Sequence, residues 1–366
     1  MAIQKFLSGN EAIAEAVKLA KPAVIAVYPI TPQTTVVEKL ADFVANGELK
    51  TEFINVESEH SALSALMGAS AMGVRTFTAT SSQGLLYMSE CLHYAAGGRF
   101  PIVMMNANRA VALPWNIFGD QRDSLSQLES GWIQLYAENA QEAFDLTLSS
   151  FAIAENHAVA LPVMLNVDGF ALTHTYEPLN IISQEDADKI LPPFKPFFEM
   201  NLEKPLSLGF SAGPRDNTAF KQHQINGMKA AAKLINEKFG DLVDAYKLEN
   251  AKYAIITLGS ISGLVRDVID ELQSDGVKVG LLRLRSLRPF PEEELRSALA
   301  NFKTVGVLEK NLSVGAENAV AKEIKSALYG LENAPQVLAF SGGLGGRDIS
   351  ANEIKDIISK IIGGEK

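Results

Sequence analysis

The chain contains a single cysteine, Cys91, among 366 residues. One thiol cannot form a disulfide within the chain, and it cannot hold an iron–sulfur cluster, which takes four ligands. The five histidines are scattered, and none of them forms an H-x-x-x-H pair. The sequence therefore predicts no metal site and no cluster built by this chain alone.

Long apolar runs and clusters of basic residues are also missing. No stretch of 18 or more apolar residues is present, so we expect no membrane span. The first residues, MAIQKFLSGNEAIAEA, do not join a basic region to an apolar core, so we expect no secretory signal and a cytoplasmic location. The formal net charge is −10 and Lys and Arg do not cluster, which makes nucleic acid a poor candidate partner.

What is present is the composition of a soluble globular protein, with 47% apolar and 21% charged residues. A chain of 366 residues exceeds what one hydrophobic core usually organises, so two domains are expected. We predict a first domain over 1–175 and a second, smaller domain over 251–366. Residues 176–250 are rich in proline at first and then contain one long helical pattern at 217–239, which indicates a crossover and linker.

Both predicted domains alternate short apolar runs with helical patterns. In the first domain the strands are expected at 23–30, 52–56, 76–80, 102–106, 132–136 and 162–167, and the helices at 32–45, 59–72, 84–96 and 140–157. In the second domain the strands are expected at 253–258, 277–284, 304–308 and 336–340, and the helices at 262–273, 291–300, 316–328 and 351–362. This alternation predicts an α/β fold with parallel sheets, doubly wound in the first domain.

Polar residues stand where the predicted strands of the first domain end. Thr31 lies between two prolines at the end of the first strand, and the stretches 57–60 (ESEH), 81–84 (SSQG) and 106–109 (NANR) follow the next three strands. Ligands bind at the carboxyl ends of the strands in doubly wound sheets. The common edge makes a single site plausible.

Each of these residues also has a structural interpretation. Thr31 before a proline fits a helix N-cap with proline at the first helical position. Ser81 and Ser82 could likewise be helix caps. Glu59 could be a first-turn acid that complements a helix dipole, and Arg109 could be a solvated loop charge.

The stretch GGLGGRD at 342–348 stands between a predicted strand and a predicted helix. It looks like a phosphate loop, but it matches neither G-x-G-x-x-G nor the Walker pattern, so a structural turn is the favoured interpretation. The stretch Leu282-Arg283-Leu284-Arg285 alternates as a strand does, and Arg285 or Arg288 could serve an interface.

Several of these stretches together resemble the alpha subunit of 2-oxoacid:ferredoxin oxidoreductases, and most of all that of pyruvate:ferredoxin oxidoreductases. The resemblance extends over nearly the whole chain in the same order. It is carried by YPITPQT at 28–34, NVESEHSALSALMGASAMG at 55–73, TATSSQG at 78–84, NANRA at 106–110, NIFGDQRDS at 116–124, GWIQLYAENAQEAFD at 131–145 and GGLGGRD at 342–348.

The resemblance implies a thiamine diphosphate enzyme that oxidatively decarboxylates a 2-oxoacid, reduces ferredoxin and transfers the acyl group to coenzyme A. It implies that Thr31 and Arg109 hold the oxoacid. Glu59 would be the catalytic acid that contacts the aminopyrimidine of the cofactor, with Pro29 near the same ring. The second domain would be similar to the C-terminal domain of transketolases.

The chain lacks the G-D-G motif, followed at some distance by Asn, with which thiamine enzymes hold magnesium and diphosphate. Gly119-Asp120-Gln121 and Gly240-Asp241-Leu242 do not fit it. We therefore expect half of an active site. A beta subunit would complete the thiamine diphosphate and Mg²⁺ site, and gamma and delta (ferredoxin-like) subunits would complete the enzyme in a dimer of heteromers. The [4Fe-4S] clusters would lie in partner subunits and pass electrons to ferredoxin.

The identity of the substrate stays open at this point. The apolar stretch VALPWNIF at 111–118 either lines the side-chain pocket of the acid, which would favour a small or branched acid, or serves only to pack the loop. Pyruvate is the first expectation, and 2-oxoisovalerate, 2-oxoglutarate and oxalate are alternatives. A non-catalytic scaffold subunit and a transketolase-like transferase are alternatives of other classes.

Overall fold

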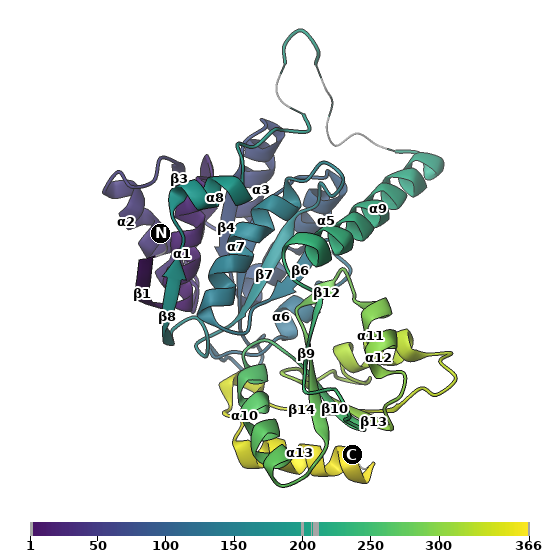
Figure 1. The fold of residues 1–366 in the computed structure, drawn as a ribbon. Coiled ribbons are helices and arrows are strands. Elements are labelled where there is room, and N and C mark those ends of the chain that lie inside the picture. The colour runs from purple at the N-terminus through teal and green to yellow at the C-terminus, as the bar shows by residue number, and fades with distance from the viewer. Residues whose placement is uncertain (1–2, 199–200, 206, 208–211, 365–366) are drawn as a thin grey trace.

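The computed structural model describes residues 3–198, 201–205, 207 and 212–364. Two α/β units follow one another along the chain, and a two-stranded ribbon flanks the first of them (Figure 1). The mixed α/β class with parallel sheets is the one that the sequence predicts. The expected domain ends at residues 1 and 366 lie outside the described residues, and the boundaries at 175 and 250 stay predictions.

The first unit is built on a seven-stranded sheet. Its strands are rich in residues that are buried on both faces, as expected for parallel strands between helices. Six of them are parallel to one another and overlap the six predicted strands. In spatial order the strands are β12 (Ser286–Arg288), β6 (Ile133–Tyr136), β7 (Val163–Asp168), β5 (Val103–Asn108), β4 (Thr76–Thr80), β2 (Val24–Val27) and β3 (Glu52–Asn55).

Helices cover both faces of this sheet, which makes it doubly wound. One hydrophobic cluster joins one face to α1 (Gly9–Ala20), α2 (Thr34–Ala45) and α7 (Ala140–Ala154). A second cluster joins the other face to α3 (Glu59–Ala71), α4 (Ser82–Tyr87) and α5 (Ser89–Gly97). The single helix predicted at 84–96 is wrong in one respect, because Met88 separates α4 from α5. A short helix, α6 (Arg122–Leu125), lies between β5 and β6.

The region predicted as crossover and linker contains regular structure of its own. β8 (Tyr176–Ile181) pairs antiparallel with β1 (Ile3–Ser8) and is followed by α8 (Gln184–Ile190). The long helix predicted there is α9 (Pro214–Lys238), whose first turns extend away from the body of the molecule (Figure 1). Within the described residues, no helix is long and apolar enough to cross a bilayer.

The second unit is built on a five-stranded sheet with helices on both faces. Four strands are parallel, and β9 pairs antiparallel with β11 at one edge. The strands in spatial order are β14 (Gln336–Ser341), β13 (Thr304–Glu309), β10 (Tyr253–Leu258), β11 (Val279–Leu284) and β9 (Val243–Tyr246). The helices are α10 (Ile261–Ser274), α11 (Glu292–Leu299), α12 (Ala319–Leu328) and α13 (Ala351–Gly363), and the short 3-10 helix η1 (Leu344–Gly346) precedes α13.

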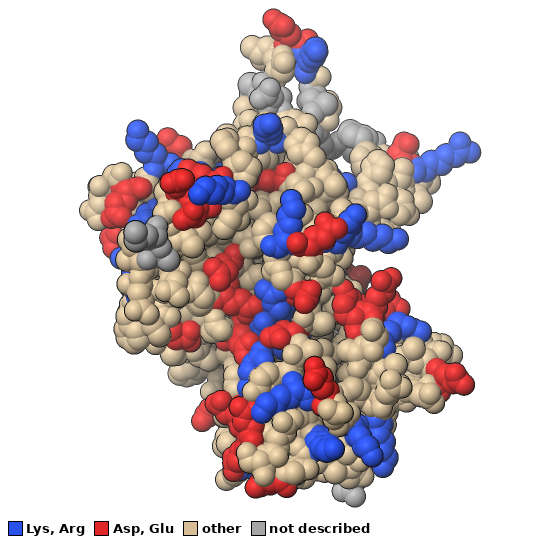
Figure 2. All heavy atoms as spheres, viewed as in Figure 1, with Lys and Arg blue, Asp and Glu red and all other residues tan. Residues whose placement is uncertain are grey.

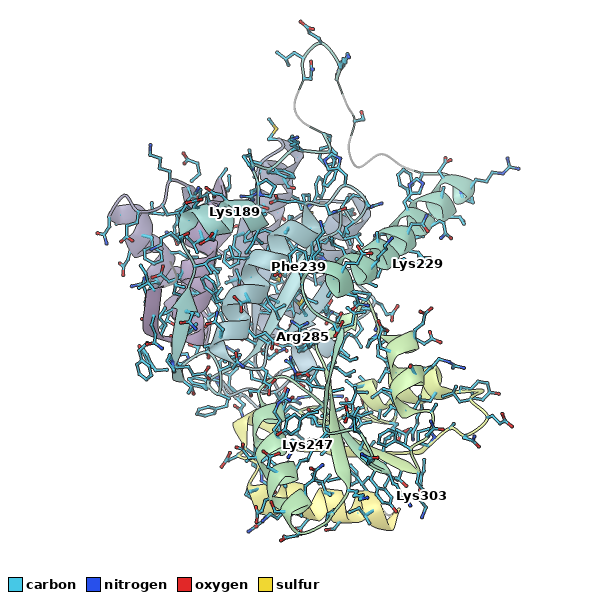
Figure 3. All side chains as sticks on the ribbon, in the orientation of Figure 1. Lys189, Lys229, Phe239, Lys247, Arg285 and Lys303 are labelled. Atoms are coloured by element: carbon cyan, nitrogen blue, oxygen red, sulfur yellow. The ribbon has the colours of Figure 1, made fainter. Side chains whose placement is uncertain are left out.

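Charged residues join the two units. Glu142, at the start of α7, accepts hydrogen bonds from Arg283 at 2.6 Å and from Arg285 at 2.7 Å. Glu138 adds an ion pair with Arg266 of α10 at 2.9 Å. Figure 2 shows acidic and basic side chains gathered over this junction, and Figure 3 shows Arg285 where the two units meet. The interface role expected for Arg285 is therefore an internal one, between two parts of the same chain.

Candidate active site

Three of the four polar stretches meet at the carboxyl edge of the seven-stranded sheet. Arg109 follows β5, and its Nη1 donates to the carbonyl oxygen of Thr31 at 2.7 Å. Its Nη2 donates to Oε1 of Gln83, in the turn after β4, at 3.0 Å. The strands β2, β4 and β5 are parallel, so their ends share one edge. The structure thus brings together the ends of three strands, as their positions in the sequence predict.

The fourth stretch reaches the same place through Glu59. Glu59 is the first residue of α3, whose N-cap Ser58 accepts a hydrogen bond from the backbone N–H of Ser61 at 3.2 Å. A β-carbon at Gly84 would lie 2.5 Å from Oε1 of Glu59 and 2.6 Å from Oγ1 of Thr80. The absence of a side chain at Gly84 is what lets the Glu59 carboxylate lie against the turn that also carries Gln83.

Glu59 is 7% exposed, and within the described residues its carboxylate has no hydrogen-bond partner. Its position in the first turn of α3 also suits a dipole-complementing acid, as the structural interpretation expects. A carboxylate that only complements the helix dipole can do so while exposed to solvent. The dipole therefore does not explain why Glu59 is buried, since burying a polar group without a hydrogen bond costs free energy. The buried hydroxyl of Thr80 also lacks a hydrogen-bond partner in the described structure. Both groups could form hydrogen bonds with the polar ring atoms of a ligand.

Arg109 is 2% exposed, so its interpretation as a solvated loop charge is wrong. Burial lowers the pKa of its guanidinium, although the nearby charges of Asp123 and Glu59 favour the cation. The guanidinium carbon lies 5.4 Å from the centre of the Trp115 ring, within the range of a cation–π contact. Its Nε is buried and has no hydrogen-bond partner among the described residues. A cation held in this way, with donors still available, suits an anionic ligand.

Thr31 is not a helix cap. The helix α2 begins at Thr34, and Gln33 occupies the N-cap position without a side-chain hydrogen bond. Thr31 is exposed in the loop that links β2 to α2, and Pro29 is exposed in the same loop. Buried Gln33 braces this loop, because its Nε2 donates to the carbonyl of Tyr28 at 2.9 Å. The loop therefore presents Pro29 and Thr31 to solvent, and Thr31 lies beside Arg109.

The two serines are not side-chain caps either. Ser81 stands at the N-cap position of α4 but makes no capping hydrogen bond. Its hydroxyl donates instead to the carbonyl of Ala107 at 2.7 Å, and the hydroxyl of Ser82 donates to the carbonyl of Ala110 at 2.6 Å. Both hydroxyls thus tie the turn after β4 to the end of β5.

Asp123, in the short helix α6, is a functional candidate that the sequence reasoning missed. It is fully buried, and burial raises the pKa of its carboxyl to about 6 although several hydrogen bonds favour the anion. The carboxylate fixes the turn after β4 and the turn after β5 in one arrangement. Its donors are the backbone N–H groups of Ser82 (3.0 Å), Arg109 (3.1 Å) and Ser124 (2.7 Å) and the side-chain amides of Asn106 (3.3 Å) and Asn108 (2.8 Å).

The apolar loop 111–118 stands over Arg109. It is closed at its base by a hydrogen bond from the backbone N–H of Ala110 to the carbonyl of Phe118, 2.9 Å long. Leu113 is 87% exposed and Trp115 is 69% exposed. Residues that served only to pack the loop would be covered, so the geometry favours a loop that meets something outside the chain.

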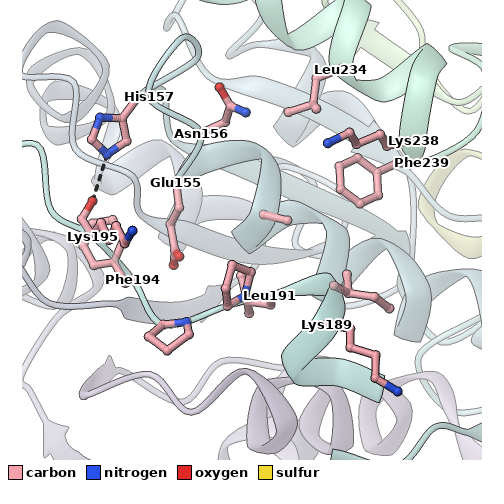
Figure 4. Close-up of a pocket in the computed structure, with 14 residues that line it drawn as sticks. Glu155, Asn156, His157, Lys189, Leu191, Phe194, Lys195, Leu234, Lys238 and Phe239 are labelled. Carbon is pink, nitrogen blue, oxygen red and sulfur yellow. Dashed lines mark hydrogen bonds between the residues drawn. The ribbon is translucent and has the colours of Figure 1, made fainter. Parts of the chain in front are cut away.

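A cavity of about 800 Å³ lies elsewhere, at the opposite edge of the same sheet (Figure 4). Leu191, Phe194 and Phe239 form part of its apolar wall, and His157 bonds to the carbonyl of Lys195 across it. Glu155, which lines it, is paired with Arg75, just before β4 begins. The cavity therefore lies at the amino ends of the strands and contains none of the candidate residues.

Two family models match the chain. The model described as "Pyruvate flavodoxin/ferredoxin oxidoreductase, thiamine diP-bdg" matches residues 15–239. The model described as "Pyruvate:ferredoxin oxidoreductase core domain II" matches residues 251–354. Together they cover both α/β units.

Similar proteins agree with these models. A pyruvate synthase subunit PorA from Methanothermobacter thermautotrophicus is 48% identical over 368 residues, covering 98% of this chain and 95% of the relative. A ketoisovalerate oxidoreductase subunit VorA from Pyrococcus horikoshii is 44% identical over 367 residues, covering 97% of this chain and 93% of the relative.

Two solved structures share the fold. A 2-oxoglutarate:ferredoxin oxidoreductase from Magnetococcus marinus aligns with a TM-score of 0.78 at 21% identity, over 99% of this chain and 65% of that one. A split gene transketolase aligns with a TM-score of 0.56 at 10% identity, over 99% of this chain and all of that one (100%).

The fold and the family models define an α/β protein of the thiamine diphosphate-binding type with a transketolase-like second unit. The chain belongs to the pyruvate:ferredoxin oxidoreductase family. It is an alpha-type subunit of a 2-oxoacid:ferredoxin oxidoreductase, and such an enzyme requires partner subunits.

Proposed function

We propose that this chain contributes the substrate-binding half of the active site to an enzyme that converts pyruvate and coenzyme A into acetyl-CoA and CO₂. Two electrons leave the substrate in the reaction, and two molecules of oxidised ferredoxin take up one each. The observation that carries the proposal is the buried, incompletely hydrogen-bonded Arg109 beside exposed Thr31, with the free carboxylate of Glu59 across the Gln83–Gly84 turn.

Thiamine diphosphate, when bound, would supply a nucleophilic carbon for the oxo group and an electron sink for the decarboxylation. Glu59 would hold the aminopyrimidine by a hydrogen bond and favour the tautomer that can accept a proton, and Pro29 would contact the same ring. Proton assistance of this kind contributes about 10²–10⁴ in rate. Arg109 and Thr31 hold the carboxylate and oxo groups of the acid, since a planar guanidinium offers paired donors and a threonine adds a neutral one.

Partner subunits supply the rest of the enzyme. A beta subunit holds the diphosphate and Mg²⁺, and gamma and delta (ferredoxin-like) subunits complete a dimer of heteromers in the cytoplasm. The [4Fe-4S] clusters belong to these partners. Support comes from the missing G-D-G motif and the single cysteine of this chain. The chain alone should bind thiamine diphosphate weakly, and tight Mg²⁺-dependent binding in isothermal titration would contradict a divided site.

The decisive experiment is to purify the native complex and to assay pyruvate, 2-oxoisovalerate, 2-oxoglutarate and oxalate with coenzyme A and ferredoxin. Preference for pyruvate supports the proposal. The 44% identity to a ketoisovalerate oxidoreductase subunit makes 2-oxoisovalerate the second candidate. A complex that turns over no 2-oxoacid, or whose turnover is indifferent to Glu59→Gln and Arg109→Lys, would instead indicate a scaffold role.

A further inference from the structure

The glycine-rich turn at 342–348 belongs to the second unit, yet it contacts the loop that covers Arg109. The backbone N–H of Gly346 donates to the carbonyl of Gly119 at 2.7 Å. The backbone N–H of Gly345 donates to Oδ2 of the buried Asp120 at 3.2 Å, and its carbonyl accepts from Nδ2 of Asn116 at 3.0 Å. Three hydrogen bonds thus tie this turn to the segment 116–120.

The contact with Asn116 reaches the exposed part of the loop. Within the described part of the chain, it is the one side-chain hydrogen bond that leaves the loop 111–118. The same amide uses its Oδ1 to accept from the backbone N–H of Phe118 at 2.7 Å, so Asn116 joins the turn to the base of the loop. Trp115 is the residue before Asn116, and its ring lies over the Arg109 guanidinium.

The turn requires glycine where it meets the loop. Gly345 has a φ of 58°, and a β-carbon there would lie 2.4 Å from Nδ2 of Asn116. Gly346 has a φ of 77°, and a β-carbon there would lie 2.3 Å from Cβ of Phe118. Both backbone conformations favour glycine. A β-carbon at Gly346 would collide with the base of the Phe118 side chain, and one at Gly345 would displace the Asn116 amide from its hydrogen bond.

We propose that the Gly345–Gly346 turn is a positioning element of the substrate site, which holds Trp115 over Arg109 through Asn116 and thereby limits the size of the 2-oxoacid that is accepted. The proposal rests on the proposed function, because it assigns the loop 111–118 to the oxoacid pocket. It gives the second unit a part in substrate selection beyond its structural one.

The test compares Gly345→Ala with Gly330→Ala in the assembled complex. Gly330 has a similar φ of 78°, but a β-carbon there would have no atom within 4 Å, so this control reproduces the backbone strain without the collision. Gly345→Ala should raise the KM for pyruvate about 2–10-fold, which is the range for one neutral hydrogen bond. It should also lower the ratio of kcat/KM for pyruvate to kcat/KM for 2-oxoisovalerate, which measures the preference for pyruvate. The control should leave the KM and the preference unchanged. Asn116→Ala removes the hydrogen bond without strain, so it should reproduce the effect of Gly345→Ala even if that variant folds poorly.

A second readout does not depend on activity. The chain has two tryptophans, and Trp132 is fully buried, so a change in tryptophan anisotropy of the full-length chain reports on Trp115. Gly345→Ala and Asn116→Ala should lower the anisotropy, whereas Gly330→Ala should not. Unchanged anisotropy and KM in Asn116→Ala would overturn the inference. If Arg109→Lys still impairs turnover in that case, the proposed function stands and only the role of the turn is lost.

Discussion

Arg109→Lys is the sharpest test of the substrate site. In the structure, Nη1 is bonded to the carbonyl of Thr31 and Nη2 to the amide oxygen of Gln83. Each terminal nitrogen of a guanidinium carries two hydrogens, so each keeps a second N–H for the oxoacid carboxylate. A lysine ammonium is a single nitrogen, and it cannot bond to Thr31 and Gln83 and still offer a fork to the substrate.

The expected loss follows from the hydrogen bonds that disappear. A hydrogen bond to a charged group contributes about 1.5–3 kcal/mol. At about 1.4 kcal/mol per tenfold, losing one such bond lowers kcat/KM for pyruvate by about 10–100-fold. The loss should appear mainly at low pyruvate, and the affinities for the cofactor and coenzyme A should change little. Thr31→Val should have a smaller effect, because the carbonyl that Arg109 binds is retained and only a neutral hydroxyl is removed.

The assay is the steady-state kinetics of the assembled complex with pyruvate and 2-oxoisovalerate. Arg99→Lys is a matched control, because Arg99 also donates to two carbonyls, those of Val159 and Ala160, both at 2.7 Å, at the other edge of the sheet. The control should leave kcat/KM unchanged. If Arg109→Lys leaves kcat/KM unchanged for every 2-oxoacid, Arg109 is not the substrate cation and the site lies elsewhere.

Three further predictions concern the same edge of the sheet. Glu59→Gln should preserve folding and assembly but remove most of the turnover. Hydrogen exchange at the cofactor thiazolium carbon should slow, as NMR after acid quench can show. Unchanged exchange would remove Glu59 from this role. Gly84→Ala should displace the Glu59 carboxylate and reduce kcat about as strongly, whereas Gly47→Ala, at a glycine with no atom within 4 Å of its β-carbon, should not. The pKa of Asp123 is raised to about 6 in the folded state, whereas the unfolded state loses the same proton near pH 4. The free energy of unfolding should therefore fall by about 3 kcal/mol as the pH rises from about 4 to about 6. Urea unfolding at pH 4.5 and 6.5 should show a smaller fall in Asp123→Asn, and equal falls in both proteins would contradict the burial argument.

The strands and helices that the sequence predicts are those with a local pattern. Apolar runs bounded by turn residues identify the six parallel strands of the first unit and the four of the second, because burial on both faces leaves a continuous apolar signal. β1 and β12 carry no such signal. β1 pairs with β8, which is more than 160 residues away along the chain, and exposes Phe6. β12 has three residues and joins the first sheet although it follows β11 of the second unit. Both depend on contacts that no local window contains.

The candidate site was predictable in part for a topological reason. Parallel strands end at one edge, so residues that follow neighbouring strands must meet there, as Arg109 and Thr31 do. Asp123 was not predictable in this way. It lies in the segment GDQRDS, which reads as a polar surface loop, and only the folded chain shows α6 inserted beneath the ends of β4 and β5. The contact between Gly345 and Asn116 crosses 229 positions of the chain and is equally invisible to a local pattern.

The turn after β4 determines how the two halves of the chemistry lie relative to each other. Gln83 bonds to the cation assigned to the substrate, and Gly84, the next residue, makes room for the carboxylate assigned to the cofactor. Two adjacent residues therefore set the separation between Arg109 and Glu59. Asp123 holds this turn through the backbone N–H of Ser82. A shift of the turn would therefore move the Arg109 guanidinium and the Glu59 carboxylate together. Substitutions at Arg109 should thus act mainly on KM and those at Glu59 on kcat, whereas loss of the Asp123 carboxylate should change both at once.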